Sequence, residues 1–140
     1  MLEVNVLALA IATREALTQM KEHGGPGHVI HISSMSGYRI TQGSGMYSAS
    51  KHAVRAMTEG LRGELRAAGS HLRVTAISPG FVETEFAQKY HGTEEANETT
   101  YGQYPVLQIE DLGRTVRFIL ESPPHMEVHD ILLRPRDQVT

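Results

Sequence analysis

The sequence has no cysteine and no tryptophan among its 140 residues, and aromatic residues make up only 6% of it. Without cysteine, the chain has no disulfide and no thiolate metal site. This absence fits a reducing compartment, and we expect a cytoplasmic location.

Long apolar runs and an excess of charge are missing as well. The net charge is -3, and charged residues make up 21% of the sequence. No stretch approaches the roughly 20 apolar residues of a membrane span. This composition is typical of a soluble globular protein and provides no strongly basic surface for nucleic acid. We therefore predict no nucleic-acid partner and no membrane span.

The first residues differ from a signal peptide. Glu3 stands where a signal peptide carries positive charge, and Arg14 and Glu15 stand where its cleavage site would lie. We interpret this segment as an amphipathic helix.

The sequence also lacks a glycine-rich turn of the kind that binds the pyrophosphate of a dinucleotide. A chain of 140 residues is long enough for one domain with a real core. It is short for a dinucleotide-binding fold, which needs two βαβαβ halves. The length therefore favours one half of such a fold.

Helical and strand patterns alternate along the chain. The ranges follow in chain order: helix 2–22, strand 28–33, helix 48–68, strand 72–78, helix 110–121 and strand 129–133. Strands that alternate with helices indicate a parallel sheet and an α/β fold.

Two helices carry additional patterns. Helix 2–22 has two apolar stripes, which predict two burial partners; the stripes are Val6, Leu9, Ala10, Leu17 and Met20, and Val4, Leu7 and Ile11. Helix 48–68 has one face of small residues. On the solvated side of this helix, we expect Arg55 and Glu59 to form an i,i+4 pair.

The stretch 84–107 is polar and has no clear periodicity. A connection this long is usually a lid, a binding loop or a set of short helices over a site. Its tyrosines, Tyr90, Tyr101 and Tyr104, either line an apolar substrate pocket or simply pack the loop down.

Tyr47 and Lys51 are four residues apart, so on a helix they share one face. A free phenol is a poor base at neutral pH, but an ammonium group about 4 Å away favours the phenolate. We therefore expect a lowered pKa for Tyr47, which suits a proton-transfer group. Taken alone, the spacing is common on amphipathic helices, and a solvated pair is its ordinary meaning.

Other residues strengthen the functional interpretation of this pair. Ser34 precedes Tyr47 by thirteen residues and follows a predicted strand, whereas Ser33 and Ser36 compete with it for the same role. A Pro-Gly-x-x-x-Thr segment, residues 79–84, follows the next strand. These coincidences in one order favour an oxidoreductase site, in which Ser34 donates a hydrogen bond to a substrate oxygen.

The eight histidines suggest a metal site only weakly. His28 and His31 are three apart on a predicted strand, so they point to opposite faces of the sheet. His125 and His129 lie across a turn with no third ligand nearby. We predict no metal site.

From Asn5-Val6-Leu7-Ala8 through Thr84, the chain resembles the C-terminal half of the short-chain dehydrogenase/reductase (SDR) family. The tail from Arg134-Pro135 to Thr140 is similar to that of the member-eleven carbonyl and ketosteroid reductases and the insect farnesol dehydrogenases. The resemblance implies the C-terminal part of a doubly wound, Rossmann-like parallel sheet with the N-terminal half absent. Residues 1–140 would then form a single partial domain.

The resemblance also implies roles for individual residues. Asn5 would lie at a helix kink that holds a water of the proton relay, and Ser34 would position the substrate carbonyl. Tyr47 would be the acid/base, and Lys51 would also bind the nicotinamide ribose. Four residues after the second strand would hold the nicotinamide carboxamide: Pro79, Gly80, Val82 and Thr84.

The activity implied by the resemblance is NAD(P)-dependent interconversion of an alcohol and a ketone or aldehyde. The substrate would be hydrophobic, such as a steroid or an isoprenoid. The cofactor would be NADP or NAD, and the resemblance favours NADP. A homo-oligomer would form through helices 2–22 and 48–68.

The chain departs from the family by lacking the glycine-rich turn and the Asn-Asn-Ala-Gly motif. Met1 falls where longer relatives have an interior residue, which suggests a truncated gene model or an alternative start. The alternative function is therefore a truncated, non-catalytic product that is unstable or associates only with full-length subunits.

Overall fold

A computed structural model describes residues 1–139 of the chain. Its elements are α1 (Leu9–His23), β1 (His28–Ile32), α2 (Gly45–Ala67), β2 (Arg73–Pro79), α3 (Phe86–His91), α4 (Ala96–Tyr101), α5 (Ile109–Glu121) and β3 (Asp130–Leu133). A π-helical turn (Glu3–Ala8) precedes α1, and a 3-10 turn (Met35–Gly37) follows β1. The predicted strands and long helices are confirmed, with shifted ends.

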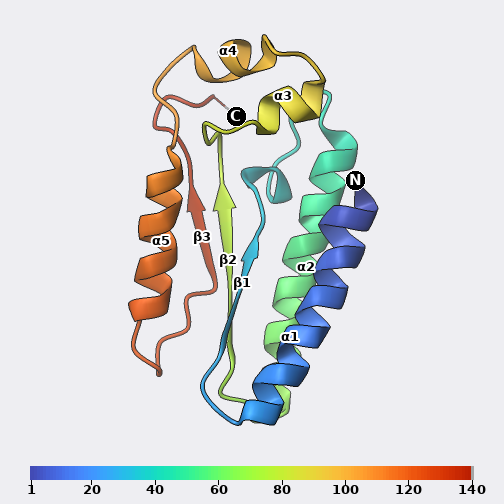
Figure 1. Ribbon diagram of the computed structural model, residues 1–140, viewed down its shortest axis with the longest axis vertical. Helices are drawn as coiled ribbons and strands as arrows, with labels where there is room; N and C mark the ends of the chain where they lie inside the picture. Colours follow the sequence, from blue (N-terminus) through green and yellow to red (C-terminus); the bar gives the residue numbers. More distant parts are fainter. Residues whose placement is uncertain (140) are drawn as a thin grey trace.

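The three strands form one parallel sheet in the order β1-β2-β3 (Figure 1). The register pairs Val29 with Val74 and Ala76 with Asp130. β2 is the central strand, and its residues from Val74 to Pro79 are buried. The prediction of a parallel α/β sheet is therefore confirmed.

Helices cover both faces of the sheet. On one face, the ring of His31 in β1 is hydrogen-bonded to Thr13 of α1 (3.0 Å) and to Thr58 of α2 (2.8 Å). On the other, Arg73 donates to the carbonyl of Ser122, at the end of α5 (3.0 Å). Figure 1 shows α1 and α2 side by side, with α5 across the sheet from them.

The N-terminal helix packs part of one of its two predicted apolar stripes against the core, although Ala10 of that stripe is exposed. Leu17 and Met20 pack against the core of Val29, Leu65, Leu72 and Val74. The second stripe faces outward: Val4 is 72% exposed, Leu7 56% and Ile11 46%. α1 ends where Gly24 takes a left-handed conformation with φ of 68°, which glycine adopts without strain.

Two predictions about α2 are wrong. The helix begins at Gly45 rather than at residue 48, so Tyr47 lies in its first turn. The expected exposed pair of Arg55 and Glu59 does not form, because Arg55 donates to the carbonyl of Gly37 (2.8 Å) and Glu59 pairs with Arg62. The Gly37 carbonyl, which is distant in sequence, therefore takes the place of the i,i+4 partner that the spacing predicted for Arg55.

The stretch 84–107 forms two short helices, α3 and α4, one of the outcomes predicted for it. In Figure 1 they lie across the end of the molecule toward which the strands point. Among the described residues, no helix is long and apolar enough to cross a membrane.

Candidate active site

A cavity of about 620 Å³ lies at the carboxyl ends of β1 and β2. It brings together seven of the eight predicted site residues: Ser34, Tyr47, Lys51, Pro79, Gly80, Val82 and Thr84. Apolar side chains complete the lining; they include Ile32, Met35, Phe81, Phe86, Tyr101, Ile109 and Leu112. Ligands of α/β sheets bind outside the carboxyl ends of the strands, so the position suits a binding site.

Ser34 begins the 3-10 turn that follows β1. Its Oγ accepts a hydrogen bond from the backbone N–H of Ser36 (3.1 Å). Its hydroxyl lies close enough to Tyr47 to lower the pKa of the phenol. Ser33, by contrast, has a buried Oγ with no partner among the described residues. The structure thus places Ser34, and not Ser33, beside the phenol.

Tyr47 lies among aromatic rings from α3. Its ring centroid is 5.5 Å from that of Phe86 and 5.7 Å from that of Tyr90. Burial raises the pKa of Tyr47 above its ordinary value, and the Ser34 hydroxyl opposes this only in part. The phenol is therefore protonated at neutral pH in this structure.

Lys51 lies one turn further along α2. Its Nζ donates to the carbonyl of Ile32 (3.1 Å) and lies 5.7 Å from the centre of the Tyr47 ring. Burial lowers the pKa of Lys51. The expected lowering of the Tyr47 pKa is therefore wrong for this structure: burial of the phenol raises its pKa, and Lys51 is not among the groups that lower it.

Asn5 lies outside the cavity lining and contacts the site through one intermediate. Its Nδ2 donates to Ser50 Oγ (3.1 Å), and Ser50 Oγ donates to the backbone carbonyl of Tyr47 (2.7 Å). Asn5 belongs to the π-helical turn, and such turns are frequent at functional sites. The residue is thereby connected to the first turn of α2.

The segment that follows β2 lines the cavity and pairs with Leu107. Leu107 donates its N–H to the Phe81 carbonyl (3.1 Å) and accepts the N–H of Glu83 (2.9 Å). Within a trans peptide group the C=O and the N–H point in opposite directions. The N–H of Val82, which shares a peptide group with the Phe81 carbonyl, therefore points away from Leu107. Val82 lines the cavity, and its N–H has no partner among the described residues.

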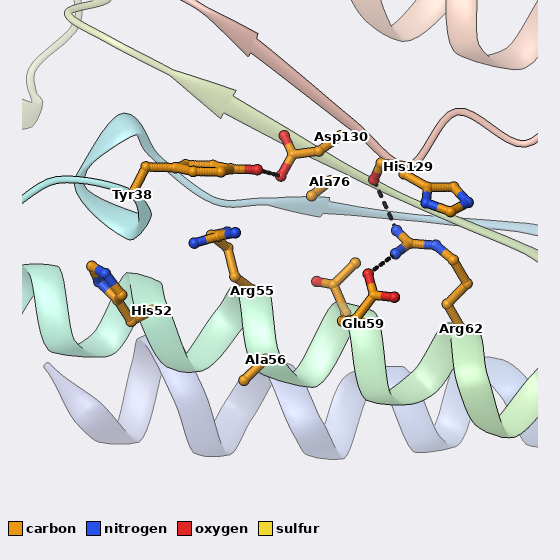
Figure 2. Close-up of a pocket in the computed structure, with 10 residues that line it drawn as sticks. Tyr38, His52, Arg55, Ala56, Glu59, Arg62, Ala76, His129 and Asp130 are labelled. Atoms are coloured by element: carbon orange, nitrogen blue, oxygen red, sulfur yellow. Dashed lines mark hydrogen bonds and ion pairs between the residues drawn. The ribbon is translucent and has the colours of Figure 1, made fainter.

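The turn that carries Ser34 is fixed from behind by residues of α2 and β3 (Figure 2). Tyr38 donates to Asp130 Oδ2 (2.5 Å), and the Arg55 guanidinium lies 3.6 Å from the centre of the Tyr38 ring. A Cβ on Gly37 would lie only 2.9 Å from the Lys51 carbonyl oxygen, so this close approach requires glycine.

Sequence reasoning did not find this support. Tyr38 and Asp130 are 92 residues apart, and no local pattern marks either of them. The polar contacts of Arg62 were not predicted either. This arginine is only 4% exposed and donates to the carbonyl of Val74. It also donates to the carbonyl of His129 (Figure 2).

The cavity fits the nicotinamide end of a dinucleotide. A planar, partly apolar ring suits its mostly apolar lining, and the free N–H of Val82 suits a carboxamide oxygen. Lys51 would contribute a cationic donor for ribose hydroxyls. Within residues 1–139, no three potential metal ligands are grouped closely enough to hold an ion.

The comparison with known families and proteins agrees with this geometry. The family model described as short chain dehydrogenase matches residues 1–95. "Dehydrogenase/reductase SDR family member 11" of Homo sapiens is 51% identical over 144 residues, which cover 100% of this chain and 55% of the relative. "Farnesol dehydrogenase" of Aedes aegypti is 38% identical, with 96% of this chain and 52% of the relative covered.

A solved structure, the closed form of a serine dehydrogenase complexed with NADP+, superposes with a TM-score of 0.93 at 32% identity. The alignment covers 100% of this chain and 56% of that one. The chain spans about half the length of the curated relatives it matches. It belongs to the short chain dehydrogenase family, as the sequence resemblance implied.

Proposed function

We propose that this chain provides the proton-transfer and nicotinamide-binding part of an NAD(P)-dependent oxidoreductase that interconverts an alcohol and a ketone or aldehyde. One observation carries the proposal: Ser34, Tyr47 and Lys51 converge with the backbone of Val82 on a single, mostly apolar cavity. Each supplies a group that this reaction needs.

Tyr47 is the proposed acid/base. Since burial raises its pKa, the phenol holds a proton at neutral pH and can donate it to a substrate oxygen during reduction. Ser34, whose hydroxyl lies beside Tyr47, donates its one O–H to that oxygen and so orients it. A nicotinamide bound beside these groups supplies or accepts the hydride.

Lys51 and the segment after β2 are the proposed cofactor-binding groups. Lys51 binds the ribose, and Pro79, Gly80, Val82 and Thr84 hold the carboxamide. Asn5, through Ser50, holds the first turn of α2 and supports a water of the proton relay. The connection from Asn5 to the Tyr47 carbonyl is the observation that favours this last role.

The proposed substrate is a hydrophobic alcohol or ketone, such as a steroid or an isoprenoid. The apolar lining supports this choice, and so does the name of the farnesol dehydrogenase relative. NADP is proposed over NAD because the serine dehydrogenase structure was solved with NADP+. The absence of cysteine supports a cytoplasmic location.

The exposed stripe of Val4, Leu7 and Ile11 favours a second candidate. An uncovered apolar stripe on a helix is suited to a subunit interface. The chain would then act as a non-catalytic partner that associates with full-length subunits. Nicotinamide binding by the 140-residue chain on its own distinguishes the two candidates.

The test uses a fusion enzyme in which the first half of the human relative precedes residues 1–140. We expect this fusion enzyme to reduce hydrophobic ketones with NADPH. The substitution Tyr47→Phe should lower kcat by about 10² to 10⁴-fold, since only the proton-transfer group is lost. NADPH affinity, measured by calorimetry, should hardly change. Ser34→Ala should lower kcat as well.

Tyr104→Phe is the matched control, because Tyr104 does not line the cavity. Retention of a tenth of the wild-type rate by Tyr47→Phe would show that Tyr47 is not the acid/base. In a parallel arm, NADPH is titrated into the 140-residue chain alone. Micromolar binding there would contradict the non-catalytic candidate.

A further inference from the structure

Gln138 is a buried polar residue in the tail that follows β3. Its side chain is only 7% exposed, although Val139 beside it is 89% exposed. Glutamine is mostly exposed in folded proteins, and a buried amide needs hydrogen-bond partners. A specific interaction must therefore hold this side chain in place.

The interaction joins Gln138 to the segment that carries Val82. Gln138 Oε1 accepts a hydrogen bond from the backbone N–H of Phe81 (2.9 Å). The tail is turned toward this segment by a bond from the Gln138 N–H to the Pro135 carbonyl (3.2 Å). Gln138 also lines the 620 Å³ cavity, so it lies at the site itself.

Gly80 shows how closely the tail approaches. A Cβ at this position would collide with Gln138 Oε1 and would lie 2.8 Å from Arg134 Cβ. Any residue larger than glycine would push the tail away from the segment. The glycine and the glutamine thus form one tightly packed unit.

This unit completes the support of the Phe81 peptides. The Gly80 N–H donates to Leu133 (2.7 Å), the Phe81 N–H to Gln138, and the Phe81 carbonyl accepts from Leu107 (3.1 Å). With the peptides on both sides of Phe81 fixed, the direction of the Val82 N–H is fixed as well. Loss of the Gln138 bond would free the middle of the three contacts.

We infer that Gln138 is a positioning residue for nicotinamide binding: its amide oxygen orients the backbone of residues 81–82 toward the cavity. This inference rests on the proposed function, because it assigns the tail a role in the same site. Gln138 acts through the backbone and has no part in proton transfer.

The test compares three variants of the fusion enzyme. Gln138→Met keeps the length of the side chain and removes the acceptor oxygen, whereas Gln138→Glu retains an acceptor. Gln19→Met, on the exposed side of α1, is the control for the change to methionine. Readouts are the NADPH dissociation constant from calorimetry, the KM for NADPH, kcat and the melting temperature.

We expect Gln138→Met to raise the dissociation constant and KM for NADPH about tenfold, with kcat changed less than threefold, because a misplaced binding group weakens positioning. Gln138→Glu should stay within threefold of wild type. If Gln138→Met fails to fold, Gln138→Asn, which is too short to reach Phe81, should show the same rise.

Equal NADPH binding by wild type and Gln138→Met would overturn the inference, as would an equal loss in Gln138→Met and Gln138→Glu. A lower melting temperature with unchanged NADPH binding would show a purely structural role and also contradict it. Calorimetry needs no turnover. Failure of the proposed reaction, seen as an inactive wild-type fusion, is therefore distinguishable from failure of this inference.

Discussion

Two walls of the cavity present different chemistry. The first wall, made by Ser34, Tyr47 and Lys51 at the ends of β1 and α2, presents side chains to the cavity. The second wall, residues 79–84 after β2, presents the backbone of Val82. Proton transfer requires side chains with suitable pKa values, whereas a carboxamide is bound equally well by peptide groups.

The walls also differ in how they are supported. The first wall is fixed mainly by helices that begin close to it, through Asn5 and Ser50 on one side and Arg55 on the other. The second wall is fixed by residues distant in sequence, Leu107, Leu133 and Gln138. Side chains that take part in the reaction form a recognisable motif in the sequence. A backbone segment that binds through its peptide groups is marked in the sequence by little more than a glycine and a proline.

Among changes that should affect both catalysis and cofactor binding, the largest effect should come from removal of Lys51 in the first wall. In the fusion enzyme, we expect Lys51→Met to lower kcat/KM for NADPH by about 10²-fold or more, through both terms, since a buried cationic donor is lost. Steady-state kinetics at saturating substrate measures this. Lys89→Met is the control, because Lys89 is exposed and pairs with exposed Glu85. A change in kcat alone would contradict a role in ribose binding.

A smaller effect, confined to binding, should follow from Gly80→Ala in the second wall. The added methyl group would collide with Gln138, so we expect a loss of about 1 to 3 kcal/mol in the free energy of unfolding and a higher KM for NADPH. Gly113→Ala in α5 meets no atom within 4 Å and should stabilise the protein by up to about 1 kcal/mol. Equal melting temperatures of the two variants would mean that the tail does not pack against Gly80.

The smallest effect should be a dependence of the free energy of unfolding on pH, caused by two histidines of β1. Burial lowers the pKa of His31, and burial followed by Arg73 lowers that of His28. The unfolded chain, with histidine pKa values near 6.5, therefore binds more protons than the folded one below that pH. The stabilisation is complete above about pH 6.5 and is lost as the pH falls toward the lowered values.

Urea unfolding of the fusion enzyme between pH 7.5 and 5.5 measures this dependence. His31→Gln should flatten the slope by at most about 1.4 kcal/mol per pH unit, the contribution of one proton. His71→Gln changes an exposed histidine and is the control. An unchanged slope in His31→Gln would show that His31 does not become protonated on unfolding in this range.

Much of the fold was predictable from local patterns. Short β-branched runs between glycine and proline turns gave the three strands, and apolar periodicity gave the long helices. The ends of the helices and the side-chain contacts were less predictable. The helix α2 begins at Gly45 and not at residue 48. Arg55 donates to the Gly37 carbonyl and does not pair with Glu59. The family resemblance of the tail was predicted up to Thr140, which lies outside the residues that the structure describes.

The site divides in the same way. The spacing of Ser34, Tyr47 and Lys51, together with the family resemblance of residues 79–84, predicted which residues meet in one cavity. They meet because parallel strands bring their carboxyl ends to the same edge of the sheet. The folded structure alone decided the protonation of Tyr47, since burial depends on Phe86 and Tyr90 from a helix without clear periodicity. It alone also decided the contacts of Tyr38 with Asp130 and of Gln138 with Phe81, because hydrogen bonds between distant residues depend on packing and leave no local pattern.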